Sequence, residues 1–376
     1  MILRPLFGRT ARLVVMTFLI AVCIVMGLTG RIISHTPPFV LLLTLFLVQT
    51  AAGAVDDWRH RHQRPLGATL CHTGFALFLV ASLLSGATRR SGIARLEPHQ
   101  AVGMAIDEDG FALPLPFVLE LDTFQLDSYT SHVKDLGPIA VNHPYRHGAW
   151  RVYQTGCDDE HGSYSILTCI RDPFAPLQAV ALWLMLLGGA VMAVRGMAGQ
   201  SHGWRVPLIA LALAVVYAAI VFSMMHLMDA PLVPALRSPW FIPHVAAYMI
   251  AYSLLTVATV SAAVSALTSD DTLRERFAAL FRRTLRSGWG MLTMGLVMGA
   301  LWAWAAWGSC WSWDAKETWA AATWLSYLLL LHLPPRRKPS TLFLLALIAF
   351  LLLQMSWYGL NWLPSSATSV HAYQMG

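Results

Sequence analysis

The sequence predicts an all-α polytopic membrane protein, with about nine transmembrane helices and one small β-rich extracytoplasmic domain. Three observations carry this prediction. Of the 376 residues, 56% are hydrophobic and only 12% are charged, whereas soluble domains carry roughly 25% charged residues. Apolar stretches long enough to cross a bilayer recur along the chain, and one long polar stretch, residues 88–173, interrupts them. This composition excludes a disordered protein, a collagen and an ordinary soluble enzyme.

The apolar stretches follow one another in order, three before the polar stretch and six after it. A helix needs roughly 20 apolar residues to cross a hydrocarbon core of about 30 Å. The expected spans are residues 13–30, 38–55, 66–87, 174–194, 206–228, 240–267, 289–307, 319–333 and 342–360. Basic residues precede the first span, as in a signal peptide, but no small-residue cleavage site follows it. We therefore expect it to remain as an anchor.

The distribution of positive charge orients the chain. With the N-terminus inside, 16 of the 26 Lys and Arg residues fall in cytoplasmic segments and only three in short external loops. Basic residues concentrate on the cytoplasmic side of membrane proteins. We therefore expect a multi-pass membrane protein with a cytoplasmic N-terminus and an external C-terminus. This topology explains the net charge of +6, which gives no support to nucleic-acid binding.

The polar stretch is expected to form a small sandwich-like domain. Strand-like runs of alternating and β-branched residues occupy positions 118–124, 150–154 and 164–170. Cys157 and Cys169 both lie in this stretch and could form a disulfide in an oxidising compartment. In a simple hairpin, however, the two would not face each other.

Four of the 14 histidines form two pairs at matched depths. His72 and His332 lie near the inner ends of two spans, whereas His244 and His371 lie at or beyond the outer ends. Taken singly, such a residue is more often a buried structural histidine than a ligand. As pairs, they fit two bis-His sites for haem iron, which has two axial positions within an apolar ring. We expect haem, with these four histidines as its axial ligands.

Tryptophan is concentrated between the seventh and eighth expected spans. Five of the 15 Trp residues fall within residues 307–324. An interfacial aromatic belt is the structural alternative, although this segment is unusually dense for a belt. Indole rings offer flat polarisable surfaces that can stack on a porphyrin. The expected binding residues of this external segment are Trp307, Trp311, Trp313, Asp314, Trp319 and Trp324.

Residues 307–319 resemble the tryptophan-rich WWD signature of haem-handling proteins in cytochrome c maturation. The segments 238–244, 322–332 and 361–373 resemble the CcsA (ResC) branch of that family in particular. Two departures are Cys310 and Ala315, which stand where the family usually has an aromatic residue and a proline. The second half also has about five expected spans, fewer than is usual in this branch.

The first half resembles the partner protein CcsB (ResB). The matching pieces are residues 72–75, 115–117, 141–144, 148–154 and 164–173, although the external domain is short for that protein. The resemblance implies a natural fusion of both halves of the System II synthase. Its expected parts are the ResB-like helices in 1–87, the β-rich domain in 88–173, a fourth ResB-like helix and linker in 174–204, and the CcsA-like domain in 205–376.

The resemblance implies an enzyme of the holocytochrome c synthase type, with haem b as its substrate. It also implies a bacterial inner membrane, with the C-terminus in the periplasm. Haem bound by His72 and His332 would pass to His244 and His371 beside the Trp-rich loop, and would then form thioether bonds to an apocytochrome c with a C-x-x-C-H motif. The expected partners are haem, this apocytochrome, the lipid bilayer and an extracytoplasmic thiol reductant, with no nucleic acid. No catalytic residue is expected beyond those that position haem.

Two alternatives stay open. The WWD signature alone permits a haem exporter or chaperone without synthase activity. A di-haem b-type electron-transfer protein would also stack two pairs of histidines through a bundle. That protein would bury its ligands within the spans, whereas His244 and His371 are expected at or beyond the outer ends.

Overall fold

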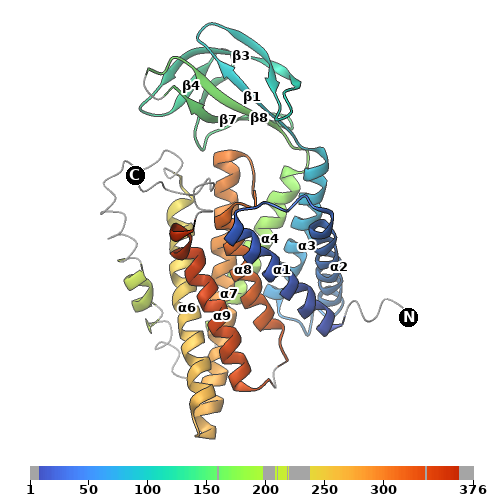
Figure 1. Ribbon diagram of the computed structural model, residues 1–376, viewed down its shortest axis with the longest axis vertical. Helices are drawn as coiled ribbons and strands as arrows, with labels where there is room; N and C mark the ends of the chain where they lie inside the picture. Colours follow the sequence, from blue (N-terminus) through green and yellow to red (C-terminus); the bar gives the residue numbers. More distant parts are fainter. Residues whose placement is uncertain are drawn as a thin grey trace, which may run out of the picture.

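A computed structural model describes residues 8–158, 161–197, 208–209, 211–217, 219, 238–334 and 337–363. Within these residues, a bundle of long helices carries a β-rich domain at one end (Figure 1). Seven of the helices are long and apolar enough to cross a membrane. The chain is therefore a multi-pass membrane protein with a separate β-sheet region.

The first four helices are α1 (Arg9–Thr29), α2 (Pro37–Arg59), α3 (Leu66–Thr88) and α4 (Ala175–Met197). Small residues let α3 and α4 approach closely, as is common between membrane helices. A Cβ atom added at Gly188 would lie 2.6 Å from Sγ of Cys71, and one added at Gly74 would lie 2.8 Å from the carbonyl oxygen of Ala181. This close contact holds α3, the helix that carries His72, in place.

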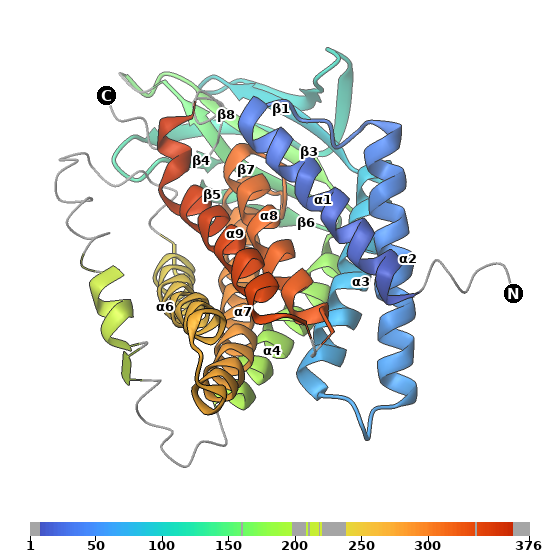
Figure 2. The same ribbon diagram turned by 60° about the horizontal axis from the view of Figure 1, so that its bottom comes forward.

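The remaining helices are α6 (Phe241–Leu267), α7 (Asp271–Trp307), α8 (Ala315–His332), α9 (Pro339–Trp357) and the short 3-10 helix η3 (Gly359–Trp362). Helix α7 has 37 residues and is about 55 Å long. The Asp270 side chain caps its start by accepting hydrogen bonds from the backbone N–H groups of Thr272 and Leu273. The helix ends at Gly308, which adopts a left-handed conformation with φ of 76°. Figure 2 shows α6, α7, α8 and α9 side by side, with α1 crossing beside α8.

Seven of the nine expected spans correspond to the seven candidate membrane helices. The expected span at 319–333 is part of α8, which is helical and mostly buried in the bundle but is not among those seven. The charged and polar residues Lys316, Glu317 and His332 near its ends lower its mean hydropathy. Its Thr and Ser side chains bond to the helix backbone, as Thr323 does to the carbonyl oxygen of Trp319 at 2.9 Å. The expected span at 206–228 lies largely outside the described residues. The count of about nine helices, the orientation and the side of the membrane on which the β-rich domain lies stay predictions.

The β-rich domain is an antiparallel sheet of eight strands in the order β5-β4-β3-β2-β1-β8-β7-β6. The strands are β1 (Arg90–Leu96), β2 (Ala101–Ile106), β3 (Ala112–Gln125), β4 (Thr130–Val133), β5 (Gly137–Ala140), β6 (Tyr145–His147), β7 (Trp150–Cys157) and β8 (Ser165–Arg171). Distant strands meet across a buried core, because Ser131 of β4 bonds to Gln154 of β7 at 2.6 Å. The three expected strand segments lie in β3, β7 and β8. Cys157 pairs with Ser165 and Cys169 with Val152, so the two cysteines are not cross-strand neighbours, as the hairpin geometry predicts.

The β7–β8 hairpin rests on the end of the bundle that faces the sheet. A Cβ atom added at Gly308 would lie 2.5 Å from Ile170 and 2.6 Å from Tyr153, so the loop that follows α7 is pressed against the sheet. The Arg151 guanidinium lies 4.9 Å from the ring centroid of Trp304. The sheet therefore packs against the end of α7, where the Trp-rich segment begins.

Candidate functional site

Two of the expected ligands, His72 of α3 and His332 of α8, come together at the end of the bundle away from the sheet. Their ring centroids lie 5.9 Å apart with an interplanar angle of 47°. Two imidazole rings that share one metal ion, with metal–nitrogen bonds of about 2 Å, have centroids roughly 6 Å apart. The structure thus places the two rings at a separation suited to a shared metal ion.

Hydrogen bonds fix the same ring nitrogen in both histidines. Nδ1 of His72 donates to Oδ2 of Asp57 at 2.7 Å, and Nδ1 of His332 donates to the carbonyl oxygen of Leu328 at 2.9 Å. Because these oxygens only accept, Nδ1 carries the proton and Nε2 keeps its lone pair in the neutral ring. Metal-binding histidines characteristically donate their second ring N–H to a carboxylate or a backbone carbonyl. Both rings are therefore in the tautomer that binds a metal through Nε2.

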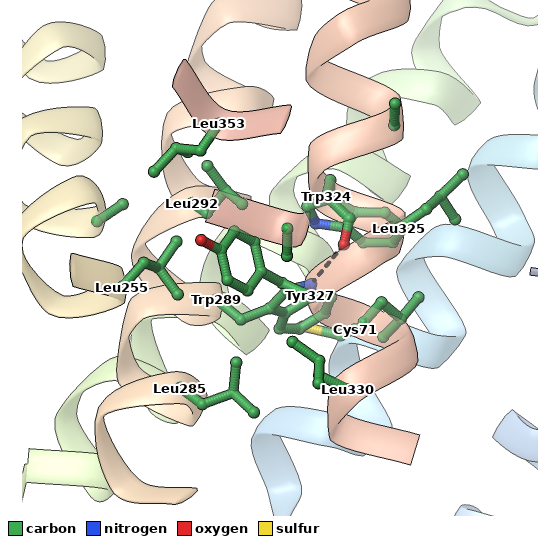
Figure 3. Close-up of a cluster of buried hydrophobic side chains, with 14 of the residues drawn as sticks. Cys71, Leu255, Leu285, Trp289, Leu292, Trp324, Leu325, Tyr327, Leu330 and Leu353 are labelled. Carbon is green, nitrogen blue, oxygen red and sulfur yellow. Dashed lines mark hydrogen bonds between the residues drawn. The ribbon is translucent and has the colours of Figure 1, made fainter. Parts of the chain in front are cut away.

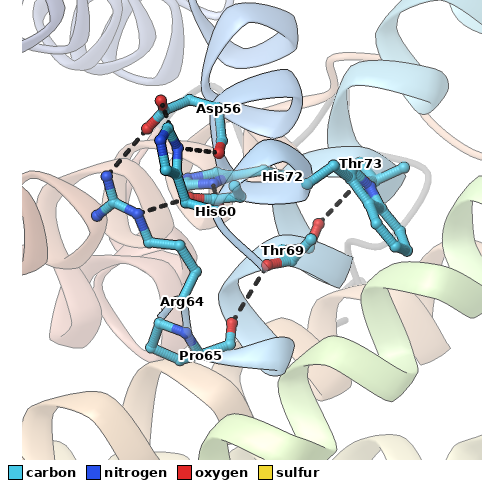
Figure 4. Close-up of polar contacts among 9 residues, drawn as sticks. Asp56, His60, Arg64, Pro65, Thr69, His72 and Thr73 are labelled. Carbon is cyan, nitrogen blue, oxygen red and sulfur yellow. Dashed lines mark hydrogen bonds and ion pairs between the residues drawn. The ribbon is translucent and has the colours of Figure 1, made fainter. Parts of the chain in front are cut away.

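Asp57 lies at the end of α2 and is only 7% exposed. A buried carboxylate needs compensating positive charge or hydrogen bonds. Besides His72, Nε of Arg64 lies 3.6 Å from its Oδ1. Figure 4 shows the neighbouring contacts, in which Arg64 also reaches Asp56 at 2.9 Å and Nδ1 of His60 donates to the backbone oxygen of Asp56. The turn between α2 and α3 thus carries the groups that hold His72.

The two histidines line a pocket between α1, α2, α3, α7 and α8. We call it the inner pocket, and the two histidines the inner pair, because they lie at the end of the bundle away from the sheet. Its lining follows one face of each helix: Arg12 and Met16; Phe46, Gln49, Thr50 and Gly53; Cys71, His72 and Phe75; Trp289; and Trp324, Leu328 and His332. The pocket encloses about 30 Å³, which is room for a water molecule. The donor atoms and the apolar lining fit an iron porphyrin, whereas the enclosed volume requires side chains to move aside before one binds.

Trp324 is a wall of this inner pocket, whereas the sequence pattern places it in the external Trp-rich segment. Its ring lies 5.0 Å from that of Phe75 and 5.1 Å from that of Trp289. Its Nε1 donates to Oγ1 of Thr293 at 2.9 Å, and Trp289 donates to its carbonyl oxygen, the dashed line in Figure 3. Phe75 of α3, Trp289 of α7 and Trp324 of α8 thus form one aromatic surface beside the two histidines, which we call the aromatic floor.

Trp319 also lies in α8 and not in the loop. A Cβ atom added at Gly27 of α1 would lie 2.6 Å from its Nε1. The indole ring is 2% exposed and fills the contact between α1 and α8. The structure thus places Trp319 in a helix that begins at Ala315, and its expected contact with haem stays a prediction.

Trp307, Trp311 and Trp313 lie at the end of the bundle that faces the sheet. Trp307 is the last residue of α7, and Trp311 and Trp313 are in the loop that follows, with ring centroids 5.7 Å apart. Trp313 adopts a left-handed φ of 61°, and its ring lies 5.0 Å from that of Phe39 at the start of α2. The strained backbone turns the loop back toward the bundle.

Asp314 caps α8 by accepting a hydrogen bond from the backbone N–H of Glu317 at 2.8 Å. The Glu317 carboxylate in turn accepts from the backbone N–H of Ser312 at 2.6 Å. The first bond satisfies an N–H group of the first turn that lacks a partner within the helix. The second ties the preceding loop to that turn. The structure therefore gives Asp314 a structural contact, and its expected contact with haem stays a prediction.

Cys310, which stands where the resembling family has an aromatic residue, is buried in the same loop. Its thiol donates to Oε1 of Gln178 at 3.8 Å. Burial raises the pKa of this thiol to about 12. The thiol is therefore protonated at neutral pH, and a protonated thiol is a poor nucleophile.

His244 lies in the first turn of α6, half-buried against α7. Its Nδ1 donates to the carbonyl oxygen of Gly295 at 2.8 Å, the same arrangement as in the inner pair. A Cβ atom added at Gly299 would lie 2.7 Å from its ring. The ring packs against Tyr248 at 4.8 Å and Trp302 at 5.8 Å.

Trp302 is a residue that the sequence pattern did not single out. Its ring lies 6.2 Å from that of Trp307, so it connects His244 to the Trp-rich segment. The signal was available, since Trp302 and Trp307 are five residues apart on one helix.

The expected partner of His244, His371, lies outside the described residues, so the outer pair stays a prediction.

Helix α8 connects the two ends of the molecule. Asp314 caps its start near the sheet, and His332 is its last residue. Its 18 residues give a length of about 27 Å. A single rigid element thus links the Trp-rich loop to the inner histidine pair.

Comparison with known proteins supplies the family. The Cytochrome C assembly protein family matches residues 175–367, which include His244, the Trp-rich loop and His332. The chain belongs to this family. The match does not include α1, α2 and α3, which supply His72 and Asp57.

Several relatives named cytochrome c biogenesis protein CcsA are similar to this chain. The protein of Parasynechococcus marenigrum (strain WH8102) is 34% identical over 183 residues, covering 38% of this chain and 58% of the relative. That of Synechococcus sp. (strain RCC307) is 39% identical over 137 residues, 27% of this chain and 44% of the relative. That of Chlamydomonas reinhardtii is 34% identical over 145 residues, 35% of this chain and 40% of the relative. The chain thus spans between 40% and 58% of the length of these three relatives.

Proposed function

We propose that this protein binds haem and attaches it covalently to apocytochrome c, as a fused CcsB–CcsA synthase. One observation supports this most strongly. His332 comes from the half that matches the cytochrome c assembly family, and His72 comes from the half that does not, yet their rings lie 5.9 Å apart in one pocket. A pocket that needs both halves is what a functional fusion requires.

At the inner site, His72 and His332 would bind the haem iron through their Nε2 atoms. Asp57 and the Leu328 carbonyl would hold the two rings in the binding tautomer. The aromatic floor of Phe75, Trp289 and Trp324 would meet the apolar part of the ring. Axial ligation by two histidines also sets the reduction potential of the iron.

At the outer site, His244 would bind haem together with His371, beside Trp302, Trp307 and the Trp-rich loop. The protein would supply positioning rather than acid–base groups. Two thiols of a C-x-x-C-H motif add across the two haem vinyl groups. Each addition forms one C–S bond and moves the thiol proton to the second vinyl carbon, so no leaving group is needed. Haem would pass from a cytoplasmic inner site to this periplasmic site, and an extracytoplasmic reductant would keep the client thiols reduced.

The test of synthase activity uses a host that lacks its own cytochrome c maturation system. The full chain is expressed with a periplasmic apocytochrome c, and covalent haem is detected by peroxidase stain after denaturing electrophoresis. We expect a stained cytochrome band. Haem that co-purifies with the protein but never becomes covalent would instead support a haem exporter or chaperone.

The outer site has its own test. His244→Ala and His371→Ala should each bleach or shift the spectrum of the bound haem and lower the yield of cytochrome. If neither substitution changes the spectrum, the outer assignment is wrong. A di-haem electron-transfer protein would show haem at both sites but no covalent product.

A further inference from the structure

The inner pocket is polar at one end and apolar at the other. Helices α1 and α3 run toward the sheet, and α2 and α8 run away from it (Figure 1). Arg12, Gly53, His72 and His332 therefore lie near the end of the pocket away from the sheet. Residues one to three turns along the same helices, such as Phe46 and Trp324, lie nearer the sheet. A ligand for this pocket has an apolar body and a polar edge.

Gly53 leaves space beside His72. The single atom within 4 Å of a Cβ added at Gly53 is Nδ1 of His72, at 4.0 Å. A larger residue would occupy the space between α2 and the histidine ring. The missing side chain gives a flat ligand room next to His72.

Arg12 is the one Lys, Arg, Asp or Glu among the described residues that line this pocket. It is partly buried, and the ion pairs found in the described part of the chain give it no acidic partner, whereas Arg64 pairs with Asp56 at 2.9 Å. A desolvated guanidinium is costly unless an anion compensates it. Its planar fork of N–H groups matches a carboxylate.

We propose that Arg12 binds a carboxylate of the ligand held by His72 and His332, which is a propionate if the ligand is haem. The inference rests on the proposed function, because it assigns the ligand of that same pocket. It adds a binding residue on α1, a helix that supplies no iron ligand. An apolar macrocycle with carboxylates at one edge matches this pocket: its carboxylates would lie at the end with Arg12, and its apolar body would lie nearer the sheet.

The test compares two porphyrins that differ only in their carboxylates. Iron protoporphyrin IX and its dimethyl ester are each titrated into the detergent-solubilised full chain, in a His244→Ala background that isolates the inner site. Wild-type Arg12 should bind the diacid about 10- to 100-fold more tightly than the ester, as expected for hydrogen bonds to a charged group. Arg12→Gln should remove this preference by weakening the diacid alone, and Arg12→Lys should keep part of it.

Arg9→Gln is the matched control, since Arg9 lies one turn earlier on α1 and is exposed. It should leave both affinities unchanged. Equal binding of diacid and ester by the protein with Arg12 intact overturns the inference without any variant. The inference is also overturned if Arg12→Gln lowers the affinity for both porphyrins equally, or if its two affinities equal those of Arg9→Gln. His72→Ala tests the proposed function separately: if that variant binds the diacid unchanged, the haem site itself is wrong, whatever Arg12 does.

Discussion

Asp57→Asn should change the chemistry of the inner haem while leaving its ligands in place. Asparagine has nearly the shape of aspartate and still offers an oxygen to Nδ1 of His72, which now lies 2.7 Å from Oδ2 of Asp57. The substitution therefore removes the negative charge and keeps a hydrogen bond. With this carboxylate only 7% exposed, solvent screens its charge weakly.

The magnitude follows from the two kinds of hydrogen bond. A bond to a charged group contributes about 1.5–3 kcal/mol and a neutral one about 0.5–1.5 kcal/mol, so the expected loss is about 1–1.5 kcal/mol. That loss is roughly tenfold in affinity, at the lower end of the 10- to 100-fold typical of such supporting residues. Ferric haem carries more positive charge than ferrous haem, so the substitution weakens the binding of ferric haem more. The reduction potential of the haem should therefore rise by on the order of 60 mV for each tenfold difference between the two losses of affinity.

The assay is a spectroelectrochemical titration of the inner haem in a His244→Ala background. Asp56→Asn is the control, because Asp56 contacts Arg64 and His60, whereas Asp57 contacts His72. We expect a raised potential for Asp57→Asn alone. Equal potentials for the Asp57→Asn and Asp56→Asn variants would refute the assignment of His72 as an iron ligand held by Asp57.

Three further predictions concern the pocket and the loop. Gly53→Phe should abolish haem retention on purification while Gly53→Ala retains it, because a Cβ at Gly53 meets only His72 at 4.0 Å and a larger ring does not fit. Gly308→Val should lower the melting temperature, since its φ of 76° and the 2.5 Å approach to Ile170 exclude a side chain; an unchanged melting curve would contradict the docking of the loop on the sheet. Asp314→Ala should cost about 1 kcal/mol of unfolding free energy in denaturant titration, and Asp314→Asn much less, because only alanine removes the helix cap.

The depth of the key residues can be predicted from the sequence alone. Hydropathy locates a residue along a span, and that location is enough to pair His72 with His332. Strand alternation likewise locates segments of β3, β7 and β8. Both signals can be found in a short stretch of sequence. Burial of one face of a strand produces alternation, and burial of a whole span produces an apolar run.

The direction in which a helix faces was not predictable. The polar and apolar residues of helix α8 do not separate onto two faces, so no amphipathic pattern indicates its contacts. The sequence pattern therefore assigns Trp319 and Trp324 to an external surface, whereas in the structure Trp319 packs against α1 and Trp324 lines the inner pocket. Asp57 was missed because it stands beside a basic turn, where a charged residue is ordinarily solvated. Only the approach of α3 to α2 reveals that its carboxylate holds a histidine.

The most direct test asks whether His72 and His332 bind one iron atom. Haem spectra are recorded for purified His72→Ala and His332→Ala variants in the His244→Ala background, with His60→Ala as an exposed control. Each variant of the inner pair should lose the low-spin six-coordinate spectrum, and added imidazole should restore it, while His60→Ala keeps it. A wild-type spectrum in both inner variants would contradict the shared site.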